Sequence, residues 1–195
     1  MQVKDIRPIK QELRERYKEQ RRAMETADKQ KKDRRISDAV RRLWQYQSCR
    51  TLLCYVSTAI EVDTRMIIKR ALEDGKRVAV PRCVPGTRLM EFYYIESLDE
   101  LLPGSFGVDE PNPDPSRLLT DMSEGLCLVP ALSYDLSGYR LGYGKGYYDR
   151  YLAAFGGSLV GLCYGDCVER HLPHGRYDRP VETLVTEQYI RRIRR

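Results

Sequence analysis

The residues with the clearest chemical potential lie in one segment, 129–152, which reads VPALSYDLSGYRLGYGKGYYDRYL. Glycine tolerates positive φ and lets a ligand approach the backbone closely, and this segment has glycines at positions 138, 142, 144 and 146. Successive N–H groups in such a loop, together with the N-terminus of a following helix, form an anion site. Arg140 and Lys145 add positive charge. The segment therefore predicts a phosphate-binding loop between a buried strand and a helix.

The spacing in this loop differs from two common nucleotide-binding patterns. A P-loop has Ser or Thr directly after its lysine, whereas Gly146 follows Lys145 here. A dinucleotide fingerprint lies near the first strand of a βαβ unit and lacks the lysine. We therefore expect a different phosphate cradle, at the C-terminal edge of a strand, where open α/β sheets bind ligands.

Hydrophobic periodicity and short apolar runs predict the elements that position this loop. We expect helices over residues 8–24, 26–46, 64–74 and 147–155, with Leu43 and Trp44 on the apolar face of the second. We expect strands over 51–56, 77–81, 88–95, 125–130, 158–164 and 183–185. The alternation predicts an α/β fold, a three-layer α/β/α sandwich with a mainly parallel, Rossmann-like central sheet. No internal repeat is visible, and we expect a single domain over residues 1–195.

Composition narrows the function classes. The chain is 32% charged with both signs mixed, and no apolar run approaches the roughly 18 residues of a membrane helix. Its charged N-terminus does not resemble a secretory signal, so we expect a cytoplasmic protein with reduced cysteines. The net charge is +6, with a basic cluster in 7–42 and a second at Arg191, Arg192, Arg194 and Arg195. This balance suits nucleic acid or anionic small molecules, and composition does not choose between them.

A Cys-His string offers a metal reading. Cys163, Cys167, His171 and His174 have C-x₃-C-x₃-H-x₂-H spacing. Structural zinc sites have a longer excursion between their Cys and His halves, so we favour buried thiols and loop histidines.

The loop and three other segments together resemble the 5-formyltetrahydrofolate cyclo-ligase family. Its signature Arg-Leu-Gly-x-Gly-Lys-Gly-Tyr-Tyr-Asp matches residues 140–149. The other matching positions, in chain order, are Lys10, Arg14, Tyr55-Val56-Ser57, Glu61-Val62-Asp63-Thr64, Pro173, Asp178, Val181-Glu182 and Thr186. The resemblance spans about residues 10–186. It implies an ATP- and Mg²⁺-dependent conversion of 5-formyltetrahydrofolate to 5,10-methenyltetrahydrofolate, with ADP and phosphate as products, through a phosphorylated formyl intermediate.

The resemblance also implies roles for individual residues. The catalytic group is Lys145, Tyr147 and Arg140. The ATP-binding group is Lys10, Arg14, Arg140, Leu141, Gly142, Gly144, Lys145 and Gly146. The folate-binding group is Val56, Glu61, Tyr143, Gly144, Lys145, Gly146 and Tyr147. The Mg²⁺ ligands are Asp149 and Glu182, although the family has an aspartate at the second position. Because Tyr147 and Tyr148 are adjacent, we expect at most one to face the pocket.

Two other readings stay open from the sequence. One is a basic nucleic-acid-binding α/β protein, supported by the basic N-terminal helices but by no nucleic-acid motif. The other is a catalytically silent, nucleotide-binding relative. We favour the enzyme and expect it to act as a monomer on 5-formyltetrahydrofolate, with or without a polyglutamate tail. We expect no nucleic acid or membrane partner.

Overall fold

The computed structural model describes residues 5–175 and 178–193, so Arg194 and Arg195 of the predicted basic cluster lie outside it. Its main sheet has seven strands in the order β12-β11-β9-β6-β1-β2-β3. These strands are β1 (Thr51–Cys54), β2 (Arg77–Cys83), β3 (Met90–Ile95), β6 (Leu126–Val129), β9 (Ser158–Leu162), β11 (Thr183–Val185) and β12 (Ile190–Arg192). The five inner strands are parallel, and an antiparallel strand closes each edge. The predicted α/β fold with a mainly parallel sheet is confirmed.

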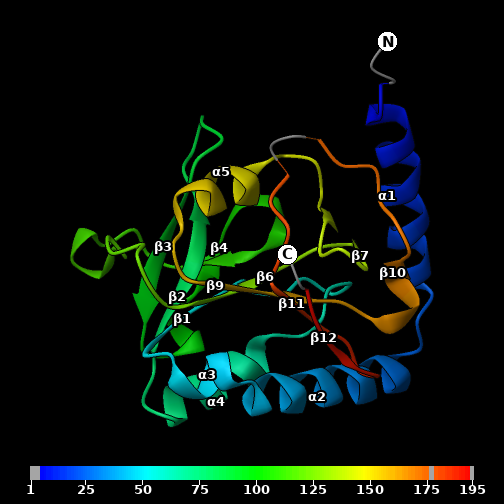
Figure 1. Ribbon diagram of the computed structural model, residues 1–195. Coiled ribbons are helices and arrows are strands. Elements are labelled where there is room, and N and C mark those ends of the chain that lie inside the picture. The colour runs from blue at the N-terminus through cyan, green and yellow to red at the C-terminus, as the bar shows by residue number, and fades with distance from the viewer. Residues whose placement is uncertain (1–4, 176–177, 194–195) are drawn as a thin grey trace.

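Helices cover both faces of this sheet (Figure 1). The helices are α1 (Arg7–Arg22), α2 (Thr26–Arg42), α3 (Trp44–Ser48), α4 (Arg65–Glu73) and α5 (Tyr147–Ala154). In Figure 1, α2, α3 and α4 lie below the sheet, α5 lies above it, and α1 stands along the side of the molecule. None of the described helices has the length and apolar character needed to cross a membrane.

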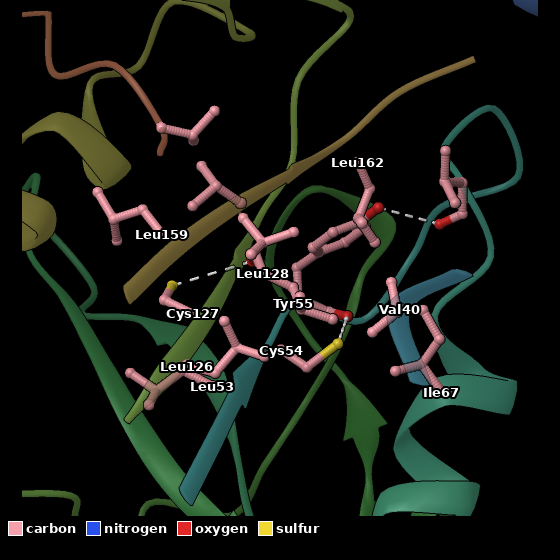
Figure 2. Packing of buried hydrophobic residues seen from close by; sticks show 14 of the residues in the cluster. Val40, Leu53, Cys54, Tyr55, Ile67, Leu126, Cys127, Leu128, Leu159 and Leu162 are labelled. Carbon is pink, nitrogen blue, oxygen red and sulfur yellow. Dashed lines mark hydrogen bonds between the residues drawn. The ribbon is translucent and has the colours of Figure 1, made fainter. Parts of the chain in front are cut away.

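The core explains the apolar runs in the sequence. Leu53, Cys54, Leu126, Cys127 and Leu128 are all 0% exposed, since the inner strands are covered on both faces. Figure 2 shows these side chains interdigitating with Leu159 from β9 and Ile67 from α4. Buried cysteine here behaves as a small hydrophobe.

The helix predicted over 26–46 is interrupted at one residue, Leu43, and its last part forms a separate short helix. Leu43 is extended, with φ −65° and ψ 136°, and separates α2 from α3. The break rotates the following residues, so Leu43 is buried while Trp44 is 70% exposed rather than part of the apolar face.

Short strands complete the fold. A hairpin joins β4 (Leu102–Pro103) to β5 (Asp109–Glu110). A small sheet contains β7 (Ser133–Asp135), β8 (Arg140–Leu141) and β10 (Val168–Glu169). Together with β12, these are elements that the sequence analysis does not predict, because ladders of two or three residues carry no readable alternation.

Candidate active site

A cavity of about 610 Å³ opens at the carboxyl ends of the inner strands. Its lining includes Tyr55 and Val56 after β1, Pro81 in β2 and Pro130 after β6. The chain leaves β1 through α4 toward β2, and leaves β6 through α5 toward β9, so the strand order reverses between β1 and β6. A crevice at such a switch point is the usual ligand site of an open α/β sheet.

Almost all the predicted site residues line this one cavity. They are Lys10, Arg14, Val56, Glu61, Arg140, Leu141, Gly142, Tyr143, Gly144, Lys145, Gly146, Tyr147 and Asp149. They come from α1, from the loop after β1, and from the continuous segment that runs from β8 into α5. The structure thus brings together residues more than a hundred positions apart in the sequence.

The glycine-rich loop lines the cavity and has a left-handed backbone at two of its glycines. Gly144 and Gly146 have φ of +90° and +74°, values that favour glycine. Gly146 directly precedes α5, so the loop delivers the chain into a helix N-terminus. Arg14 Nε donates a hydrogen bond of 2.8 Å to the carbonyl oxygen of Gly142, which ties α1 to the loop.

We expect Gly144→Ala to destabilise the fold by more than the usual cost of about 1 kcal/mol for a left-handed alanine. A Cβ at Gly144 would lie 3.1 Å from Arg14 Cζ, so the guanidinium that binds the loop has to move. Chemical denaturation measures the loss. Gly86→Ala is the matched control, because Gly86 has φ +72° with open space around its Cβ position. Equal losses in both variants would show that the Arg14 contact adds nothing.

Positive charge gathers on one side of the cavity. Arg140 is buried and donates to the Asp149 carboxylate and, at 2.8 Å, to the carbonyl oxygen of Arg179. Lys10 Nζ lies 2.5 Å from Asp178 Oδ2. Lys145 is exposed, and its ammonium lies 5.4 Å from the centroid of the Phe106 ring. Arg140 is buried and held by these bonds, whereas Lys145 forms no salt bridge within residues 5–175 and 178–193 and is free to reach an incoming anion.

The cavity has two carboxylates that suit a divalent cation. Asp149, in the first turn of α5, and Asp178 both line it, and Arg140 acts electrostatically on Asp178 while bonding to Asp149. Burial raises the pKa of Asp178, but hydrogen bonds from Lys10 and from the Gly175 N–H outweigh it and leave the pKa lowered. Carboxylates beside a phosphate-binding loop match the oxygen ligands that Mg²⁺ prefers.

Glu182, the other predicted metal ligand, is not in this cavity. It directly precedes β11 and lines a separate cavity with Ser158, at the start of β9, and Gly125, just before β6. That cavity is at the amino ends of the parallel strands, the opposite edge of the sheet from Asp149. The structure therefore does not bring Glu182 and Asp149 together, and the carboxylate that shares the cavity of Asp149 is that of Asp178.

Aromatic residues also line the cavity. Tyr147 and Tyr148 both contribute to the cavity lining. Tyr148 also packs against the hydrophobic core and its hydroxyl is buried, so the expectation that at most one of the two faces the cavity stays a prediction. Burial raises the pKa of Tyr148 well above its usual value, and its buried hydroxyl has no partner among the described residues. The Tyr148 hydroxyl is therefore protonated at neutral pH.

Phe106 is a site residue that the sequence analysis misses. It lies in the β4–β5 hairpin, is 66% exposed, and has φ +60°, an uncommon value for a residue with a side chain. Its ring lies 6.4 Å from that of Tyr147. The only local sequence signal is its position between Gly104 and Gly107, which reads as an ordinary turn.

The Cys-His string does not assemble at one point. Cys163 and Cys167 are fully buried, whereas His171 is exposed and His174 stacks on Tyr139 with ring centroids 3.6 Å apart. Across residues 5–175 and 178–193, no three His, Cys, Asp or Glu side chains form a group that could hold a metal.

Comparison with known proteins gives one result. Residues 6–187 match the profile of the 5-formyltetrahydrofolate cyclo-ligase family. A probable 5-formyltetrahydrofolate cyclo-ligase from Schizosaccharomyces pombe is 31% identical over 175 residues, covering 81% of this chain and 85% of its own. The 5-formyltetrahydrofolate cyclo-ligase of Saccharomyces cerevisiae is 33% identical over 175 residues, covering 77% and 82%.

Structural comparison agrees with the sequence match. The solved structure of 5,10-methenyltetrahydrofolate synthetase from Aquifex aeolicus superposes with a TM-score of 0.80 and 29% identity, covering 96% of this chain and 94% of that one. The family is thus matched by sequence over nearly the whole chain and by fold, and all ten residues of its signature segment, 140–149, line the cavity described above. The chain belongs to the 5-formyltetrahydrofolate cyclo-ligase family, whose enzymes convert 5-formyltetrahydrofolate to 5,10-methenyltetrahydrofolate.

Proposed function

We propose that this cavity binds ATP and 5-formyltetrahydrofolate side by side and joins them in one phosphoryl transfer. The observation that carries the proposal is that the Lys145 loop and the Glu61 carboxylate line the same cavity. The triphosphate lies against the backbone from Gly142 to Gly146, with Lys10, Arg14 and Lys145 around it. Phosphoryl transfer needs such positioning and positive charge more than covalent help.

The folate occupies the other half of the cavity. Glu61 is 6% exposed, and its Oε2 accepts hydrogen bonds from the Thr58 N–H at 2.8 Å and from the Thr58 hydroxyl at 2.9 Å. These bonds orient the carboxylate. A carboxylate is the natural partner for the amino and ring N–H donors of a pterin. Val56 and Tyr147 provide apolar and aromatic contact.

The chemistry follows from that placement. The formyl oxygen attacks the γ-phosphorus of ATP, and the bond to ADP breaks. N10 of the folate then attacks the former formyl carbon and loses its proton, and phosphate leaves with the former formyl oxygen. Lys145 and Arg140 stabilise negative charge that develops on the transferring group. Asp149 and Asp178 would hold Mg²⁺, which when bound neutralises phosphate charge.

A direct assay tests this function. The purified protein is mixed with 5-formyltetrahydrofolate and Mg²⁺, and methenyl absorbance is followed with and without ATP. We expect product only when ATP is present, in equal amount to the ADP formed. No product with ATP and Mg²⁺ would contradict the proposal, and is the result expected of a silent relative or a nucleic-acid-binding protein.

We expect Glu61→Gln to raise the KM for the folate by about tenfold or more and to leave the KM for ATP nearly unchanged. A hydrogen bond to a charged group contributes about 1.5–3 kcal/mol, and the amide cannot accept from two pterin donors as the carboxylate does. Steady-state kinetics with each substrate varied measures the split. Glu73→Gln, an exposed change on α4, is the control. Equal rises in both KM values would contradict the assignment of Glu61 to the folate.

Three further expectations stay predictions from the sequence: the monomeric state, the binding of polyglutamylated substrate and the cytoplasmic location. For the last, a relative from Arabidopsis thaliana is named as a mitochondrial enzyme, so family membership by itself does not fix the compartment.

A further inference from the structure

Buried polar side chains bond to the backbone of the loop that carries Glu61. Four consecutive residues, 60–63, each have one backbone atom bonded by a side chain from a different part of the fold. The four bonding side chains are Arg21 to the Ile60 carbonyl, Tyr164 to the Glu61 carbonyl, Tyr55 to the Val62 carbonyl, and Asp33 to the Asp63 N–H. Buried backbone groups need hydrogen-bond partners, and here side chains from other elements supply them. Three of these four side chains, those of Arg21, Asp33 and Tyr164, lie outside the cavity lining, so the conformation of this loop depends largely on residues that do not line the cavity.

Arg21 is the first of these side chains. It extends from the last turn of α1 and is only 3% exposed. Its Nη1 donates to the Ile60 carbonyl at 3.2 Å, and its Nη2 to the carbonyls of Ala131 and Leu132 at 2.9 and 2.7 Å. One guanidinium thus joins the Glu61 loop to the segment after β6.

Burial of the charged Arg21 side chain has a free-energy cost. No acidic side chain in the described part of the chain forms a salt bridge with Arg21, and its hydrogen-bonded oxygens are backbone carbonyls. Burying a charge without a counter-ion is unfavourable, and an apolar residue of similar size would pack at less cost. The planar guanidinium offers instead several donors in fixed directions, which suits the fixing of two loops at a set distance.

Tyr164 bonds to the backbone of Glu61 itself. Its ring is 0% exposed, and its hydroxyl lies 3.0 Å from the Glu61 carbonyl oxygen and 2.7 Å from Asp33 Oδ1. Asp33 Oδ1 also accepts from the Asp63 N–H at 3.1 Å, and Lys29 pairs with its second oxygen. The hydroxyl thus links α2 to the loop directly beneath the carboxylate that faces the cavity.

We propose that Arg21 and Tyr164 are positioning residues for folate binding, which act by holding the loop so that the Glu61 carboxylate points into the cavity. The proposal rests on the proposed function of Glu61. Neither residue lines the cavity, so neither touches the substrate. Both act through the backbone of residues 60 and 61. Because Thr58 binds the Glu61 carboxylate within the same loop, a shift of that loop carries the carboxylate with it.

The test is Tyr164→Phe, which removes one hydroxyl and keeps the ring. We expect the KM for the folate to rise about fivefold, as for loss of one buried hydrogen bond, while kcat and the KM for ATP change less than about twofold. Tyr46→Phe is the matched control. Tyr46 is also buried and donates to a carboxylate, Asp74, at 2.7 Å, but away from the cavity. It should lose similar stability in a thermal melt without any change in the folate KM.

A double-mutant cycle separates positioning from general weakening. If Tyr164 acts through Glu61, the variant with both Tyr164→Phe and Glu61→Gln binds folate no worse than Glu61→Gln alone. Three results would overturn the proposal. The first is a double variant whose rise in folate KM equals the product of the two single rises. The others are a Tyr164→Phe variant with an unchanged folate KM, or with equal rises in the KM values for folate and ATP. If Glu61→Gln itself leaves the folate KM unchanged, the proposed function fails instead.

Arg21→Lys gives a second, independent variant. It keeps the buried positive charge but cannot reach the Ile60 carbonyl and the Ala131–Leu132 carbonyls at once. We expect the same selective rise in the folate KM and the same non-additivity with Glu61→Gln. A folded Arg21→Lys protein with the wild-type folate KM would overturn the role of Arg21, even if Tyr164→Phe does not fold.

Discussion

Replacing Lys145 by alanine should lower kcat by about 10²–10³-fold while leaving the protein folded. The side chain is exposed in the glycine-rich loop and supports no core packing, so its loss costs little stability. Its charge acts mainly on the transferring phosphoryl group, where positive charge is most valuable as the bond to ADP breaks. Initial rates of methenyl formation under saturating ATP and folate measure the effect, and a thermal melt checks the fold.

Lys31→Ala is the control for this prediction. Lys31 is equally exposed but lies on α2, on the other side of the sheet from α5 (Figure 1). It should retain wild-type kcat. If Lys145→Ala turned over at a near-normal rate, the catalytic charge would have to be assigned elsewhere, with Arg140 the next cation on the cavity wall.

Asp149→Asn should raise the Mg²⁺ concentration needed for half-maximal activity by about tenfold. An amide keeps the size of the side chain but loses the charge that Mg²⁺ prefers in its ligands. The change also removes the ionic partner of the buried Arg140, so a modest loss of stability is expected alongside. Rates measured across a Mg²⁺ titration, with ATP held constant, separate the two effects.

Glu182→Gln is the contrasting variant, because Glu182 lines the cavity at the opposite edge of the sheet. Its Mg²⁺ titration should overlay that of the wild type. If Glu182→Gln strongly raised the Mg²⁺ concentration for half-maximal activity and Asp149→Asn did not, the metal would bind at the edge of the sheet that carries Glu182. That result would contradict the assignment of Asp149 as a ligand.

The fold was largely predictable because the central sheet is buried on both faces. Strands such as β1 and β6 must then be short, continuous apolar runs, which are easy to see in the sequence. The antiparallel edge strand β12 is different. Its residues Ile190, Arg191 and Arg192 are all exposed, so no burial pattern marks them and only pairing with β11 defines the strand.

The candidate site was predictable where it is local. Residues 140–149 are contiguous, and glycine, cationic and carboxylate residues in one loop are enough to indicate phosphate binding. The resemblance paired Asp149 with Glu182, whereas the structure has Asp178 in the cavity of Asp149 and Glu182 in the other cavity. Such a separation depends on tertiary structure, and the spacing of residues in the sequence does not reveal it. Phe106 was missed for a similar reason: its hairpin folds over the loop from some forty residues away in the chain.

We propose above that the glycine-rich loop binds the triphosphate of ATP beside the Glu61 loop. A crystal structure with a non-hydrolysable ATP analogue, Mg²⁺ and 5-formyltetrahydrofolate tests it most directly. We predict that phosphate oxygens contact the backbone from Gly142 to Gly146 and the Lys145 ammonium, and that the pterin binds to Glu61. A triphosphate bound in the cavity that Glu182 lines, or a pterin distant from Glu61, would contradict it.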